Sequence, residues 1–117
     1  MSLKFDPEEY KGVAIEYASA AFIEIKDALA GKWDAMTDLQ KHTLERATKR
    51  VLELEVQKLA GKDVAGDLAF VRNTIAGFKL AGEIEASSVL QDAFWKGVDK
   101  AAGVLGTFLI TALKGLI

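Results

Sequence analysis

The chain has 117 residues, which is the size of one domain, and half of these residues are apolar, which excludes a disordered protein. The formal net charge is -2 and no basic face or stripe is present, so we expect no nucleic-acid partner. The absence of cysteine excludes disulfides and thiolate chemistry. No apolar run follows a basic region at the start, so we expect no secretory signal and a cytoplasmic location.

The apolar spacing is helical throughout, and a single proline argues against an all-β chain. We therefore predict an all-α fold, an antiparallel helical bundle that forms one domain over 1–117. The first helix should span 7–30, with Asp6 as its cap, Pro7 at its first position, Glu9 in a capping box and Gly31 at its end. Its expected core side comprises Ala14, Tyr17, Ala18, Ala21, Phe22, Ile25, Ala28 and Leu29.

The second helix should span 38–60. A capping box from Thr37 to Gln40 marks its start, and Gly61 marks its end. Its wide apolar side comprises Leu44, Ala47, Val51, Leu52, Leu54, Val56 and Leu59. Asp63 follows the turn at Gly61 and should cap the next helix.

Two apolar stripes run through 64–115, where no strong stop signal occurs. One stripe comprises Val64, Leu68, Val71, Ile75, Phe78 and Gly82. The other keeps one heptad phase through Phe70, Gly77, Ile84, Val98, Leu105 and Ala112. We therefore predict one very long third helix, which uses one side within the bundle and the other against a further partner. The alternative is a break at 82–88, where Ser88 and Gln91 offer a capping box, and it gives a four-helix bundle.

No arrangement of residues predicts catalysis, a metal site or a bound cofactor. His42 is the single histidine, and we expect it on the surface of a charged helix. The Glu-x-x-His spacing of carboxylate metal sites in helical bundles does not occur in the sequence. Glu24, beside an apolar side, and Trp33, in a connector, are the residues that a small-ligand site between helices would use. Binding of a small ligand is therefore kept as one alternative function.

The C-terminal segment is the most apolar part of the chain, and 101–113 carries no charge. This run is shorter than the ~20 residues that a membrane-spanning helix needs. Lysines along one side of it suit a helix that lies on a membrane surface, which is a second alternative. We expect instead a homo-oligomer in which another copy covers the apolar side. The residues predicted to self-associate are Phe94, Trp95, Val98, Ala101, Leu105, Phe108, Leu109, Ala112 and Leu116.

The run from Glu55 to Ala69 reads EVQKLAGKDVAGDLA, and an alanine-rich helix and an apolar tail of Leu, Gly and Ala follow it. This layout resembles small, uncharacterised, all-helical proteins that tailed phages and prophages encode. The resemblance rests on composition and layout and covers the larger, C-terminal part of the chain. It implies a phage-encoded structural or accessory role, with association with the virion, and it implies no enzymatic activity.

Overall fold

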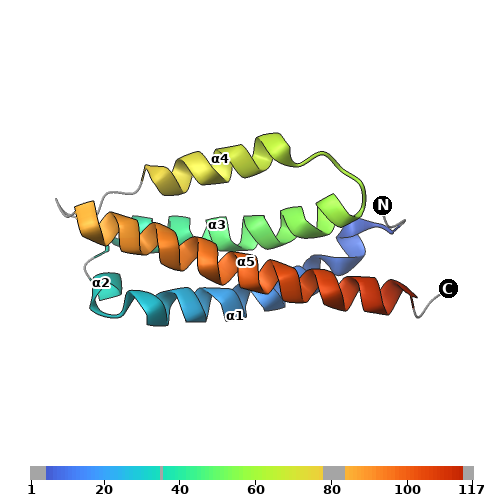
Figure 1. The fold of residues 1–117 in the computed structure, drawn as a ribbon, viewed down its shortest axis with the longest axis horizontal. Coiled ribbons are helices and arrows are strands. Elements are labelled where there is room, and N and C mark those ends of the chain that lie inside the picture. The colour runs from blue at the N-terminus through green and yellow to red at the C-terminus, as the bar shows by residue number, and fades with distance from the viewer. Residues whose placement is uncertain (1–4, 35, 78–83, 115–117) are drawn as a thin grey trace.

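A computed structural model describes residues 5–34, 36–77 and 84–114, and this part of the chain is helical and without strands (Figure 1). The elements are a 3₁₀ turn η1 (Pro7–Tyr10), α1 (Lys11–Leu29), α2 (Gly31–Asp34), α3 (Asp38–Leu59), α4 (Ala65–Ala76) and α5 (Ile84–Lys114). In Figure 1, α1 and α4 run in one direction, and α3 and α5 run in the opposite direction. The predicted all-α antiparallel bundle is confirmed.

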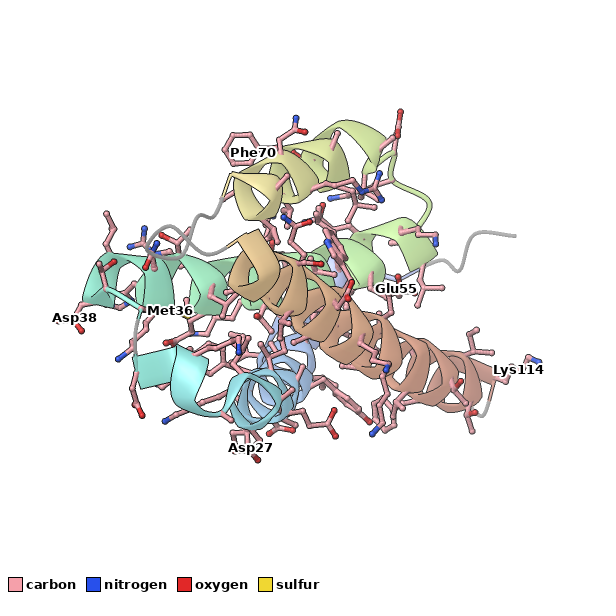
Figure 2. All side chains as sticks on the ribbon, turned by 60° about the vertical axis from the view of Figure 1, so that its left-hand side comes forward. Asp27, Met36, Asp38, Glu55, Phe70 and Lys114 are labelled. Carbon is pink, nitrogen blue, oxygen red and sulfur yellow. The ribbon has the colours of Figure 1, made fainter. Side chains whose placement is uncertain are left out.

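Three long helices, α1, α3 and α5, pack against one another, and α4 packs mainly on α3. In both views α4 lies on the far side of α3 from α1 (Figures 1 and 2). The largest fully buried side chains come from all three long helices and include Ile25, Leu44, Leu52, Phe94 and Leu105. The bundle measures 53 × 26 × 19 Å, and the C-terminal end of α5 projects beyond α3 and α4 (Figure 1).

The start of the first helix is only partly as predicted. The Asp6 carboxylate accepts from the Glu8 N–H at 3.0 Å and not from Glu9, the first turn is 3₁₀, and α1 begins at Lys11 and not at residue 7. The start of the second long helix is as predicted. The capping box of α3 is complete. Thr37 Oγ1 accepts from the Gln40 N–H at 3.1 Å, and Gln40 Oε1 accepts from the Thr37 N–H at 3.0 Å. A cap of this kind contributes about 1 kcal/mol to helix stability.

The end of α3 is also as predicted. Gly61 has a φ of 92°, its N–H donates to the Lys58 carbonyl, and the Lys62 N–H donates to the Gln57 carbonyl, each at 3.0 Å. These two bonds form a Schellman motif, which needs a residue that tolerates positive φ. The Asp63 carboxylate then accepts from the N–H two residues on, at the start of α4.

The end of α1 differs from the prediction. Ala30, not Gly31, takes the positive φ, with φ 49° and ψ -124°, and Gly31 opens the short helix α2. Trp33 of α2 packs edge-on against Phe22 of α1, with 5.3 Å between ring centroids. This contact holds the connector against the end of α1, and the backbone reverses one residue earlier than the glycine would suggest.

The prediction of one very long helix over 64–115 is wrong. α4 ends at Ala76, where the Gly77 N–H donates to the Asn73 carbonyl at 3.1 Å, and α5 runs back in the opposite direction (Figure 1). The reversal allows α5 to pack against both α1 and α3, which a straight continuation of α4 would leave behind. Tertiary packing therefore overrides the helical pattern of the sequence.

The alternative with two helices in this region is correct, but its predicted break position and capping box are not, because α4 already ends at Ala76 and residues 84–88 belong to α5. Ser88 lies inside α5, which has already begun at Ile84. Residues 78–83 lie outside the described residues, and with them part of the predicted break at 82–88 and two residues of the first stripe, Phe78 and Gly82.

The predicted core sides of α1 and α3 are confirmed for most positions. In α1, Tyr17 and Phe22 are half-buried and Ala28 is exposed, whereas the other predicted residues are buried. In α3, Leu59 is half-buried and the other predicted residues are buried. Thr48 is the one buried polar residue of the described chain, and its hydroxyl donates to the Leu44 carbonyl at 2.8 Å.

Among the described glycines, Gly97 of α5 has the tightest contact, and this contact is with α1. A Cβ atom there would lie 2.7 Å from Ile25 Cγ1 and 3.6 Å from the Ala21 carbonyl oxygen. Because Ile25 is fully buried, it could give way only by displacing its neighbours in the packed core. About one turn further on, Lys100 Nζ lies 3.1 Å from Glu24 Oε1, in an exposed ion pair worth at most about 1 kcal/mol. The packing of α1 against α5 therefore requires a residue without a Cβ atom, a glycine, at position 97.

Two glycines of α5 provide a matched test of this contact. We expect Gly97→Ala to lower the free energy of unfolding by about 1 kcal/mol, because overpacking outweighs the gain in helix propensity. Gly103→Ala, whose Cβ would meet no atom within 4 Å, should raise it by up to about 1 kcal/mol. Urea denaturation measures both variants, and equal shifts would contradict the close approach.

The backbone of Ala30 provides a second test. An alanine in this conformation carries strain of about 1 kcal/mol or more, which glycine does not. We therefore expect Ala30→Gly to raise the free energy of unfolding by about 1 kcal/mol, whereas Ala20→Gly, on the exposed side of α1, should lower it by a similar amount. Thermal denaturation of both variants decides, and destabilisation by Ala30→Gly would rule out the strained turn.

Candidate functional site

Four of the residues predicted to self-associate lie in the core of the chain itself. Phe94, Val98, Leu105 and Leu109 are 0% exposed. They face α1 and α3 because α5 folds back along both helices. The prediction that these four side chains offer a surface to a second copy is therefore corrected, since the bundle covers them without a partner.

The other predicted residues lie nearer the surface. Trp95, Ala101 and Ala112 are half-buried, and Phe108 is 44% exposed. The Phe108 ring lies 6.1 Å from the ring of Tyr17 on α1, so it covers the edge of the α1–α5 contact. Leu116 lies outside the described residues.

The exposed side of α5 changes character along its length. In its first part the exposed residues include Asp92, Lys96, Asp99 and Lys100, but between 101 and 111 every exposed residue is uncharged. We call this uncharged surface the tail patch, which comprises Gly103, Val104, Thr107, Phe108, Ile110 and Thr111. Val104 is 51% exposed, and the patch lies in the C-terminal half of α5.

One feature that the sequence does not predict is a cleft between α3, α4 and α5. It has a volume of about 400 Å³. Its walls comprise Val51, Leu54, Glu55 and Lys58 of α3, Leu68 and Arg72 of α4, and Trp95, Asp99 and Ala102 of α5. The Arg72 guanidinium lies 5.7 Å from the centre of the Trp95 ring, in a cation–π contact between α4 and α5. Since the sequence predicted α4 and α5 as one helix, no signal placed these residues together.

A second hollow lies between α3 and α4, away from α5. It has a volume of about 460 Å³, and Arg46, Arg50 and Phe70 lie along it. Phe70 is 73% exposed and points away from the bundle (Figure 2). Arg50 lies 3.7 Å from Asp67 and 3.5 Å from Glu53, so it is shared between two carboxylates. This side of α4 therefore carries an exposed aromatic ring beside arginine.

The three residues that the sequence suggested for chemistry lie apart from the cleft. His42 is exposed on α3, as predicted. Glu24 pairs with Lys100 on the surface. Trp33 is half-buried at one end of the bundle, with the Lys26 and Lys41 ammonium groups 5.3 and 5.4 Å from its ring centre. These contacts give Trp33 and Glu24 packing and surface-pairing roles.

The placement of α5 can be tested by two adjacent substitutions. Leu105→Ala should lower the free energy of unfolding by about 2–5 kcal/mol, because it opens a cavity in the core. Val104→Ala, next to it in the tail patch, should change that energy by about 0.5 kcal/mol or less. Urea denaturation at low protein concentration measures both. A small effect of Leu105→Ala would mean that α5 does not pack in the core.

Residues 5–34, 36–77 and 84–114 contain no group of three or more histidine, aspartate or glutamate side chains that could hold a metal ion. The helices described there include none with the length and hydropathy to cross a membrane. No protein-family model, curated protein or solved structure matches the chain.

Proposed function

We propose that the protein is a self-associating helical protein with a structural or accessory role and no catalytic activity. The observation that carries the proposal is the tail patch, where three large apolar side chains, Val104, Phe108 and Ile110, are 36–51% exposed without a charged residue among them. Val104 and Phe108 lie one helical turn apart and so form neighbouring exposed apolar surface, and an exposed apolar patch often marks an interaction site. Depletion of charge is also typical of the centre of protein interfaces.

A second copy is the proposed partner because the patch can be self-complementary. In a two-fold dimer the same surface meets itself, which requires that it carry no strong charge of one sign. Phe108 would supply an aromatic anchor, and the small residues Gly103 and Thr107 would allow a second helix to approach. The exposure of Val104, Phe108 and Ile110 leaves the patch accessible to another copy.

A protein partner is favoured over a membrane surface by the way α5 uses its apolar residues. An interfacial helix inserts its large apolar side chains into lipid, but Phe94, Leu105 and Leu109 are already buried in the bundle. Lys100 is paired with Glu24, and Asp99 lies beside it, which reduces attraction to anionic lipid. The resemblance to phage-encoded helical proteins supports a role in the cytoplasm of an infected cell or in the virion. We include this location in the proposal.

Sedimentation velocity tests the proposal. We expect the wild-type protein to sediment as an oligomer whose population grows with concentration. Phe108→Asp should raise the dissociation constant of the oligomer at least about tenfold, because an interface anchor contributes about 2 kcal/mol or more.

The control is Ile23→Asp, which places the same charge at a 60% exposed position on α1, outside the tail patch. This variant should associate like the wild type. Circular dichroism should show the same helicity for both variants. A wild-type protein that stays monomeric at its highest soluble concentration, or equal weakening by both substitutions, would disprove the proposal.

A further inference from the structure

We propose that the cleft between α3, α4 and α5 binds a small zwitterion, a molecule with an ammonium group and a carboxylate group on an apolar body, such as a free aromatic amino acid. The cleft lies on a different side of α5 from the tail patch. Trp95, Asp99 and Ala102 line the cleft, and Val104 and Phe108 belong to the patch. The proposal therefore stands independently of self-association.

The walls of the cleft suit an apolar body. Leu54 is fully buried and Val51 is 6% exposed, and these two residues of α3 lie against half-buried Leu68 and Ala102 from α4 and α5. The volume of about 400 Å³ lies within the range of about 300–1,000 Å³ that is usual for small-molecule sites. An apolar group that enters would cover the exposed parts of Leu68, Trp95 and Ala102, which favours binding by about 25 cal/mol for each Å² covered.

Charged groups of both signs surround these apolar walls. Glu55 and Lys58 come from α3, Arg72 comes from α4, and Asp99 comes from α5. Within the described residues none of these four groups forms an ion pair, and Glu55 is half-buried. Figure 2 shows Glu55 on α3 next to α5, where its Oε1 would lie 3.4 Å from a Cβ atom at Gly106. The cleft therefore offers two carboxylates and two cations, of which Lys58, Arg72 and Asp99 are exposed to water and can be reached by a ligand.

The balance of these charges selects the ligand. A purely anionic ligand would meet Glu55 and Asp99, and a purely cationic ligand would meet Lys58 and Arg72, so each would be repelled by two groups. A zwitterion satisfies both sets. Its ammonium can donate to the carboxylates, and its carboxylate can accept from Arg72, whose guanidinium carbon lies 5.7 Å from the centre of the Trp95 ring.

A series of four probes with one body tests this selection. The unaltered protein is titrated with L-phenylalanine, phenethylamine, 3-phenylpropionate and ethylbenzene, and the indole N–H signal of Trp95 is followed by NMR. A Trp33→Phe variant assigns that signal, because the chain has two tryptophans. We expect saturable binding of L-phenylalanine that is at least about tenfold tighter than binding of either singly charged probe, since each charged hydrogen bond adds about this much.

Absence of a saturable shift with L-phenylalanine would overturn the proposal. So would equal affinity for the singly charged or uncharged probes, which would mean that the cleft takes apolar groups without regard to charge.

Substitutions within the cleft separate the two halves of the recognition. Arg72→Gln should remove the advantage of L-phenylalanine over phenethylamine, and Glu55→Gln should remove its advantage over 3-phenylpropionate. The matched controls, Arg46→Gln and Glu45→Gln on parts of α3 outside the cleft, should keep both advantages. Ala102→Leu should fill the cleft and abolish binding of all four probes, and if it fails to fold, the two charge substitutions decide. Equal effects of cleft and control substitutions would overturn the proposal.

Discussion

The contact between α1 and α5 at Gly97 is the constraint on which the bundle depends. Ile25 fills the space that a side chain at position 97 would need, so the Ile25 side chain of α1 packs against the backbone of α5 at Gly97. This approach seals the apolar side of α5 against α1 while α3 covers its other flank. The arrangement buries Phe94, Val98 and Leu105 completely, and it leaves α4 to pack outside, over the edge between α3 and α5.

Features governed by neighbouring residues could be predicted from the sequence. Thr37, Gln40 and Gly61 set the limits of α3 through hydrogen bonds that span only a few residues, so the residue types determine the geometry. The limit between α4 and α5 could not be predicted in this way. A shared heptad phase shows which residues are apolar, but it does not show whether the chain continues straight or turns back. That choice depends on the free energy that α5 gains by packing on α1 and α3.

The apolar pattern alone also could not show which neighbour covers the predicted self-association residues of α5. An apolar stripe through Val98 and Leu105 satisfies the core of its own chain or a partner equally well, because burial is non-directional. The sequence therefore identified an apolar side of α5 but assigned four of its nine predicted residues to a second copy when they pack within the chain itself, and of the described residues in that set Phe108 alone is exposed. The cleft was beyond reach, because Glu55, Arg72 and Trp95 converge only when three separate helices are placed.

The pairing of the first long helix with the last one has a consequence for synthesis. Glu24 meets Lys100, 76 residues later in the chain. While the ribosome still holds α5, α1 and α3 can pair with each other, but the apolar groove between them has no cover. The core is complete only after α5 has been synthesised and has folded back, so until then this groove is open to chaperones and to other nascent chains.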